Sequence, residues 1–401
     1  MRRRLWLGAA ALASSLAAAH AIAVWIFLFR VMPVHEDVRM TYVAAQAGLR
    51  YGWSTIYDQA TLRGLSASFP AGQTTINDLY TYVHPPLVAW LFAPLTAFSE
   101  PHAYLVCTVV SLAALVLAWQ LAAPFSAGLA KASLLLLAIG LWPVLSSFYY
   151  GQPVALVLAC VAGSWWLVKR DRPLAAGAVL AAATFLKPQL VWMLPVALVV
   201  SGRTRVFLAW AAGCLVLGAA SAIALGSAGI NGWLHALQAN QSDPAHTVST
   251  LIHFFGVGPL TVALWLVFAA GALTVAYRRR QDADIAFTVG LLAPALVAFH
   301  FHELDYSILV LASWFFLQSS PPLWQRLWLI PGIAAFELLA VANFGGPAWD
   351  VPSHASVIVW SAAWLAILAG PELRAGAYQQ LVVSARPRWD EAVVDEVHKR
   401  T

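Results

Sequence analysis

Long apolar blocks separated by short polar connections run through most of the chain. The apolar residues form continuous runs rather than an amphipathic period, and about 20 such residues suffice for a membrane-spanning helix. We therefore predict an all-α polytopic membrane protein with about 12 spanning helices, within a range of about 10 to 13. Spans are expected at 5–30, 102–123, 131–148, 152–168, 174–186, 189–200, 206–225, 257–277, 285–300, 306–318, 327–343 and 355–369.

Two segments after the first block depart from this pattern. Residues 31–84 are polar and rich in aromatic side chains, so we predict a large outer loop that contains short interfacial helices. Residues 84–98 are apolar but carry Pro85, Pro86 and Pro94, which interrupt helical hydrogen bonding. We interpret 84–98 as a re-entrant or interfacial element, because irregular backbone at membrane depth requires cover from protein or water.

Composition strengthens the membrane interpretation. Of the 401 residues, 61% are hydrophobic and 10% charged, whereas soluble domains carry about 25% charged residues. The three cysteines, Cys107, Cys160 and Cys214, lie inside apolar blocks and show no metal-ligand or CxxC spacing. The basic start resembles a signal peptide, but the apolar run of about 25 residues is too long for one. We predict an uncleaved first helix.

The basic residues fix the predicted orientation. All but five of the 23 Lys and Arg residues fall on one side of this topology, and the exceptions are Arg30, Arg39, Arg50, Arg63 and Lys187. The positive-inside rule makes that side cytoplasmic, with both termini there, in a bacterial-type inner or plasma membrane. On the opposite, outer side we expect loops at 226–256 and 343–354. Counting 84–98 as a full span would reverse every later cluster. We expect one integral-membrane domain over 1–370 and a cytoplasmic tail over 371–401.

The charges also bear on partners. The net charge of +5 is distributed over short inter-helix clusters, without a basic face that would indicate nucleic acid. Neither a Walker loop nor a GxGxxG motif after a strand is present, so no nucleotide-binding motif is recognised. An activated substrate would then have to arrive already attached to a lipid carrier.

Two charged positions are the main candidates for chemistry. Asp37, with His35 and Glu36, follows the first predicted helix on the outer side, where a carboxylate can act as a general base. The alternative is an ordinary solvated loop start. Lys187 interrupts an apolar hairpin, and an ammonium there suits a lipid-linked phosphate. The alternative is a lysine that snorkels from a helix end.

A third cluster lies in the segment from His300 to Tyr306. His302 and Asp305, three residues apart, would share one helix face and bind a sugar or phosphate, with a metal as the less favoured alternative. His84 and Gln152 are weaker candidates on the same side. Glu337 is an intramembrane carboxylate to which we assign no role.

Taken in order, several short motifs resemble glycosyltransferase family 87. They cover about 35–315 and comprise His35-Glu36-Asp37, Ile56-Tyr57-Asp58, Tyr82-Val83-His84-Pro85-Pro86, Tyr150-Gly151-Gln152, Leu186-Lys187-Pro188-Gln189 and Phe301-His302-Glu303-Leu304-Asp305-Tyr306. Two places depart from the pattern. Val38 stands where the family often has an aromatic residue, and Pro153-Val154 where it tends to have Asn.

The resemblance implies a GT-C-like fold and a membrane glycosyltransferase. Such enzymes take a hexose, mannose in the best-known cases, from a polyprenyl-phosphate-sugar donor and pass it to a lipid or glycan acceptor at the outer face. Carried over, Asp37 is the general base with Glu36 in reserve, and Lys187 binds the donor phosphate. The other substrate-binding candidates are His302, Asp305, Arg39, His84 and Gln152. No cofactor is expected, and no metal is required if cationic side chains suffice.

Two other classes stay open on the sequence. A transporter or flippase for a lipid-linked or small polar substrate would use broken helices such as the one at Lys187-Pro188. A catalytically silent membrane scaffold would not depend on Asp37. No internal repeat supports the transporter.

Overall fold

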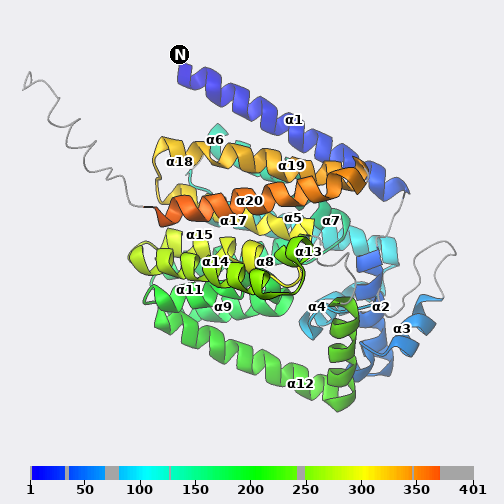
Figure 1. The fold of residues 1–401 in the computed structure, drawn as a ribbon. Helices are drawn as coiled ribbons and strands as arrows, with labels where there is room; N and C mark the ends of the chain where they lie inside the picture. The colour runs from blue at the N-terminus through cyan, green and yellow to red at the C-terminus, as the bar shows by residue number, and fades with distance from the viewer. Residues whose placement is uncertain are drawn as a thin grey trace, which may run out of the picture.

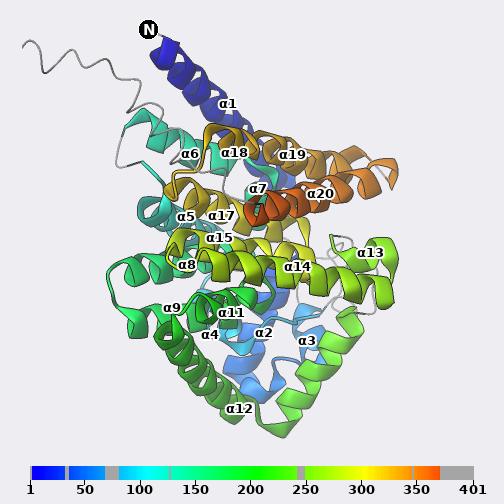
Figure 2. The same cartoon turned by 60° about the vertical axis from the view of Figure 1, so that its left-hand side comes forward.

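The computed structural model describes residues 2–31, 36–67, 81–125, 128–241, 249–345 and 347–370. His35, Asp78, Asp243 and the predicted tail lie outside these ranges. The described residues form helices throughout, without a strand among them. Long helices lie side by side in the body of the molecule, and shorter ones cross their direction at one end (Figures 1 and 2).

The apolar blocks form the helices that the pattern predicts. The longer ones are α1 (Arg2–Val31), α5 (Glu100–Ala122), α12 (Thr204–Gln241), α14 (Pro259–Arg278), α19 (Leu329–Gly345) and α20 (Asp350–Ala369). The shorter ones are α6 (Leu129–Gly140), α7 (Trp142–Tyr149), α8 (Val154–Lys169), α9 (Pro173–Leu186), α10 (Pro188–Val191), α11 (Met193–Val200), α15 (Ala283–Leu292), α16 (Pro294–Val297), α17 (Ser307–Gln318) and α18 (Leu323–Leu327).

Each predicted span overlaps one of these helices, but their lengths differ. Within the described residues, six helices are long and apolar enough to cross a membrane, and the bent pair α6–α7 makes a seventh. Helices such as α8 and α9 are apolar but shorter, so the count of twelve stays a prediction.

Helices α6 and α7 meet at a bend of 59°. A bend inside an apolar layer leaves backbone N–H groups without helical partners, and each such group is costly to bury. The carboxylate of Glu337 on α19 accepts a hydrogen bond from the backbone N–H of Trp142 at 3.1 Å, where α7 begins. The intramembrane carboxylate to which the sequence assigned no role therefore caps α7 at this break.

Residues 36–67, called the outer segment below, contain short helices, as the sequence predicts. The outer segment contains α2 (Glu36–Tyr51), the 3-10 turn η1 (Trp53–Thr55) and α3 (Gln59–Ser66). The proline-rich segment follows as α4 (Pro86–Phe92) and η2 (Ala93–Ala97), both too short to span. Glu36 and Asp37 lie in the first turn of α2 rather than in a loop.

One expected outer loop is wrong. Residues 226–256 were predicted as a loop, but α12 continues to Gln241 beyond a kink at Gly226, and α13 (Leu251–Phe255) follows. Gly226 has a φ of 60°, a conformation that glycine adopts without strain. The second arm of α12 turns to lie beside η1 and α2 (Figure 2). The expected loop at 343–354 is similarly short, because α20 begins at Asp350 after the turn η5 (Pro347–Trp349).

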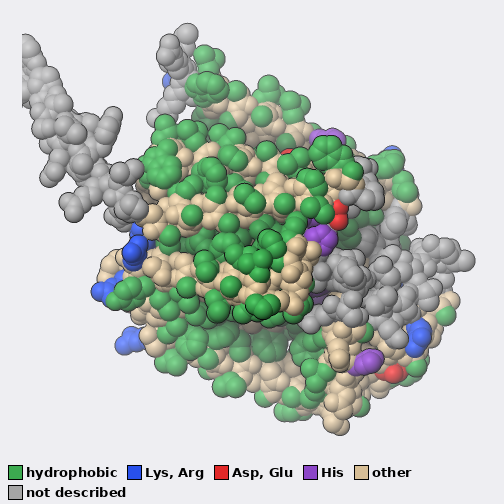
Figure 3. Space-filling model, in the orientation of Figure 1, with side chains coloured by type: hydrophobic (Ala, Val, Ile, Leu, Met, Phe, Trp, Pro, Cys, Tyr) green, Lys and Arg blue, Asp and Glu red, His purple; other side chains and the backbone are tan. Residues whose placement is uncertain are grey.

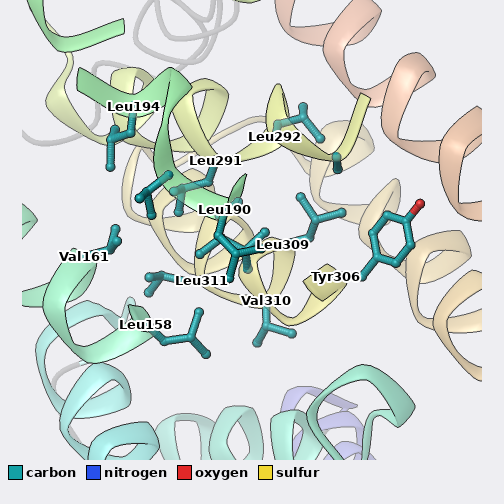
Figure 4. Packing of buried hydrophobic residues seen from close by; sticks show 14 of the residues in the cluster. Leu158, Val161, Leu190, Leu194, Leu291, Leu292, Tyr306, Leu309, Val310 and Leu311 are labelled. Atoms are coloured by element: carbon teal, nitrogen blue, oxygen red, sulfur yellow. The ribbon is translucent and has the colours of Figure 1, made fainter. Parts of the chain in front are cut away.

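The buried core lies between α8, α10, α11, α15 and α17. Its side chains include aliphatic ones such as Leu158, Leu190, Leu291 and Leu309 (Figure 4), together with buried aromatic rings such as Tyr306. At the end where α14 meets α15, basic side chains gather on the surface (Figure 3), and Arg203 donates to the carbonyl of Arg280 at 3.1 Å. The orientation of the chain in the membrane stays a prediction.

Candidate functional site

A chain of polar contacts joins four of the segments that the sequence singled out. The side-chain amide of Gln152 donates from Nε2 to Oδ2 of Asp37 at 2.6 Å. Its carbonyl oxygen accepts from Nζ of Lys187 at 3.2 Å. Lys187 in turn forms an ion pair with Oδ1 of Asp305 at 2.5 Å. The predicted base and the predicted phosphate ligand are therefore connected through one amide.

Local structure explains why these side chains meet. Asp37 lies in the first turn of α2, and Asp305 lies in the 3-10 turn η4 (Glu303–Tyr306). Lys187 lies between α9 and α10 with an extended φ of −157°. Pro188 begins α10 there and cannot donate to the preceding turn, so the helix breaks at the lysine.

Gly151 brings Gln152 to Asp37. It follows α7 with a φ of 63°, which favours glycine. A Cβ built on Gly151 would also collide with Cγ2 of Val38, the residue next to Asp37. Tyr104 holds the preceding turn by donating to the carbonyls of Phe148 at 3.0 Å and Tyr149 at 2.9 Å. Because residue 151 has no side chain, Gln152 can approach Asp37 closely.

The ion pair is buried. The side chain of Lys187 is 3% exposed and that of Asp305 is 0% exposed. Burying two charges is favourable only when the pair is close and its remaining hydrogen-bonding capacity is met. Oδ2 of Asp305 accepts from the backbone N–H of His302 at 3.0 Å, and Gln152 takes a further donor of Lys187. The pair is therefore close, and each of its two members has a further polar contact.

His84 completes the cluster from the segment before α4. Burial, and then the positive charge of Lys187, lowers the pKa of His84 from 6.5 to about 4, against the opposing effect of Asp37 and Asp305. His84 is therefore neutral near pH 7. Its backbone carbonyl accepts from the Tyr57 hydroxyl at 2.6 Å.

A stack of aromatic rings packs against the segment that carries His84. The ring of Tyr57 stacks on Tyr82 with centroids 5.5 Å apart and on Trp233 of α12 at 5.8 Å. Trp233 also donates from its indole to the carbonyl of Val83 at 3.0 Å. The second arm of α12, which the sequence misassigned as loop, therefore holds the outer segment in place.

Arg39 lies in a different contact from the one expected. Its guanidinium forms a two-bond pair with Glu100, at 2.8 Å to Oε1 and 3.0 Å to Oε2, and both side chains are buried. The pair ties α2 to the start of α5. Arg39 is thus engaged with a carboxylate, whereas the sequence favoured a role with substrate phosphate.

His302 and Asp305 also differ from expectation. They do not share the face of a regular helix, because Asp305 closes the single turn η4 onto the backbone of His302. The ring of His302 is half-buried and packs edge-on against His300 with centroids 4.6 Å apart.

Sequence reasoning missed two partners. Gln152 was expected only as a weak candidate, yet it bridges Asp37 and Lys187. Glu303 accepts from the indole of Trp142 at 3.0 Å, which fixes η4 to the start of α7. The position of Gln152 after a glycine was the available signal, but its two partners are distant in sequence.

Within the described ranges, no group of three or more His, Cys, Asp or Glu side chains is arranged to hold a metal ion. What the cluster offers is a carboxylate held by an amide, a buried ion pair behind that amide and a neutral imidazole beside them. These groups suit the abstraction of a proton from a hydroxyl.

A family model for glycosyltransferase family 87 matches residues 82–302. This range includes Gln152, Lys187 and His302, whereas Asp37 precedes it. Neither the comparison with curated proteins nor that with solved structures found a match. Because the family match covers more than half of the 401 residues, the chain belongs to glycosyltransferase family 87 and is a membrane glycosyltransferase.

Proposed function

We propose that the protein transfers a hexosyl group, mannose-like in stereochemistry, from a polyprenyl-phosphate donor to a hydroxyl group of a lipid or glycan acceptor. The reaction takes place at the outer face of the membrane, where charge topology locates Asp37. The observation that carries the proposal is the contact chain from Asp37 through Gln152 to Lys187 and Asp305. It joins a carboxylate near the end of the first helix to the core of the matched family region.

Chemistry supports the proposed donor class, in addition to family membership. The sequence has no recognised nucleotide-binding motif, and the connections between helices on the predicted cytoplasmic side are short. A sugar carried on a membrane lipid needs no such motif, because the lipid itself delivers the sugar to the membrane surface. This argument favours a polyprenyl phosphate over a sugar nucleotide as the donor.

In the proposed step, Asp37 accepts the proton of the acceptor hydroxyl. The hydroxyl oxygen forms the new bond to the anomeric carbon, while the bond from that carbon to the phosphate oxygen breaks. Polyprenyl phosphate leaves with the electron pair and gains one negative charge. Hydrogen-bond donors directed at that oxygen stabilise the transition state. Glu36 stays a prediction as a reserve base.

The phosphate side of the reaction needs a revised assignment. Lys187 was expected to hold the donor phosphate, but its ammonium already bonds Asp305 and Gln152 and is 3% exposed. We therefore propose that the phosphate lies beside His302, whose side chain is half-buried, with the neutral imidazole of His84 nearby. Lys187 would contact it only if the ion pair opened.

The test is a donor comparison in liposomes. The purified protein is supplied with radiolabelled mannosyl polyprenyl phosphate or with the corresponding nucleotide-linked mannose, together with membrane lipid extract as acceptor. We expect a labelled lipid or glycan product from the first donor alone. Transfer from the nucleotide donor in membranes free of polyprenyl phosphate would contradict the donor assignment. Counterflow of the labelled donor without a covalent product would indicate a transporter instead.

A further inference from the structure

We infer that Gln152, held by the Lys187–Asp305 ion pair, positions Asp37 for proton transfer, and that Lys187 is a positioning residue rather than a phosphate ligand. The inference rests on the proposed function, because it concerns how the proposed base is oriented. It assigns roles to three residues, none of which has to touch the substrate.

The first step concerns the side-chain amide of Gln152. An amide has a donor end and an acceptor end, and it can be turned over at little cost when its partners accept either. Here each partner, Lys187 or Asp37, can bond only one end of the amide. The ammonium of Lys187 can only donate, so it requires Oε1, and the carboxylate of Asp37 can only accept while ionised, so it requires Nε2. Only one orientation of Gln152 satisfies both neighbours.

The second step concerns what fixes Lys187. Its side chain is almost fully buried, and Asp305 holds it at 2.5 Å. Asp305 is fixed in turn by the backbone N–H of His302, and η4 by the indole contact between Trp142 and Glu303. The donor that orients the amide therefore belongs to the packed interior, and its geometry does not depend on bound substrate.

The third step is the consequence for Asp37. Oδ2 receives an N–H from Gln152 at 2.6 Å, and that N–H cannot be exchanged for an acceptor while Lys187 stays in place. Oδ2 is therefore held as the acceptor of this N–H. The hydrogen bond also limits rotation of the carboxylate plane. Misplacement of a reacting group by about 1 Å typically costs on the order of 100-fold in rate.

This role and a phosphate-binding role predict different kinetics. Loss of a group that binds the donor equally in the ground and transition states raises the donor KM, whereas loss of orientation in the transition state lowers kcat. The two variants to compare are Gln152→Leu and the double variant Lys187→Met/Asp305→Leu. The double variant removes both charges together, because removing one would leave the other buried and uncompensated.

Matched controls lie far from the cluster in the fold. Gln318 donates from its amide to the carbonyls of Ala122 and Ala123, so Gln318→Leu removes a comparable amide that has no link to Asp37. Lys169 pairs with Asp284 at 3.2 Å, so the double variant Lys169→Met/Asp284→Leu removes an ion pair at the opposite end of α8. Both controls should retain the wild-type kcat and donor KM.

The experiment measures transfer from mannosyl polyprenyl phosphate in liposomes for each full-length variant, after gel filtration confirms its folding. We expect kcat to fall roughly 10- to 100-fold for Gln152→Leu and for the double variant, with a donor KM within about twofold of wild type. An arginine at position 187 also only donates, so Lys187→Arg should keep more of the kcat than the double variant.

Two results would overturn the inference. A raised donor KM with a preserved kcat would make Lys187 a phosphate ligand, and an unchanged kcat in Gln152→Leu would remove the positioning role. If the double variant does not fold, Gln152→Leu decides alone, because it leaves the ion pair intact. A wild type that transfers no sugar from this donor would instead contradict the proposed function, so the two failures are separable.

Discussion

Gly151→Ala perturbs the approach of Gln152 to Asp37 without touching either side chain. Gly151 has a φ of 63°, and an added Cβ would collide with Cγ2 of Val38. Val38 is fully buried in a small cluster with Tyr42 and Tyr104, so it has little room to move. The substitution therefore combines a backbone effect and a packing effect.

The two effects can be given magnitudes. A left-handed φ costs alanine about 1–2 kcal/mol relative to glycine. Forcing an extra methyl group into a packed core costs about 1–3 kcal/mol more. Gly202 separates them, because its φ is 84° and nothing lies within 4 Å of its Cβ position. Gly202→Ala should therefore show the backbone effect alone.

The assay combines thermal unfolding in detergent with sugar transfer in liposomes. We expect the apparent unfolding temperature to fall further for Gly151→Ala than for Gly202→Ala. Only Gly151→Ala should lose kcat, by roughly tenfold or more, because displacement of Val38 shifts the neighbouring Asp37. In the double variant Gly151→Ala/Val38→Ala, the combined destabilisation should be smaller than the sum of the two single effects.

Either of two outcomes would refute this reasoning. Equal destabilisation by the two glycine substitutions would show that the contact with Val38 is not limiting. A strongly destabilised Gly151→Ala that keeps its full kcat would show that the position of Gln152 does not govern Asp37.

Three further predictions concern stability. Arg39→Met leaves the buried Glu100 without its partner and should cost about 3–5 kcal/mol, more than the double variant Arg39→Met/Glu100→Leu; equal unfolding temperatures would contradict this. Because the pKa of His84 is lowered from 6.5 to about 4, the unfolded chain binds more protons between these values, so stability should decrease as the pH falls from 6.5 toward 4. In His84→Gln, stability should depend less on pH over this range, and an unchanged pH dependence would contradict the prediction. Asp58 accepts from the backbone N–H of Thr61 at the start of α3, so Asp58→Ala should destabilise that helix by about 0.5–2 kcal/mol, seen as faster hydrogen exchange over 59–66.

Much of the helical layout follows from local pattern. Apolar run length placed the helices now seen at α1, α5, α14 and α20, because burial in lipid depends on composition over about 20 residues. Segment 84–98 was predicted not to span the membrane because its prolines interrupt helical hydrogen bonding. The second arm of α12 was missed because Gly226 looks like a loop signal, whereas in the structure it is a kink within a continuing helix. Contacts with Tyr57 and Val83, which are distant in sequence, hold that arm against the rest of the protein.

The sequence indicated the residues of the candidate cluster, but it did not indicate the contacts between them. Asp37 and Lys187 stood out because charged residues near apolar blocks are unusual. Their connection through Gln152 depends on segments that lie 115 and 35 residues apart along the chain. No local pattern encodes such a meeting. The contact of Arg39 with Glu100 was not foreseen either, because the sequence suggested only a substrate phosphate for this arginine.

The central claim is that Asp37 acts as the base in sugar transfer from a lipid-linked donor. The most direct measurement is single-turnover transfer from mannosyl polyprenyl phosphate by Asp37→Asn in liposomes, with Asp58→Asn as a control carboxylate from the same outer segment. General-base catalysis contributes about 10²–10⁴-fold, so we predict a loss of that order for Asp37→Asn and a wild-type rate for Asp58→Asn. A wild-type rate for Asp37→Asn would contradict the account.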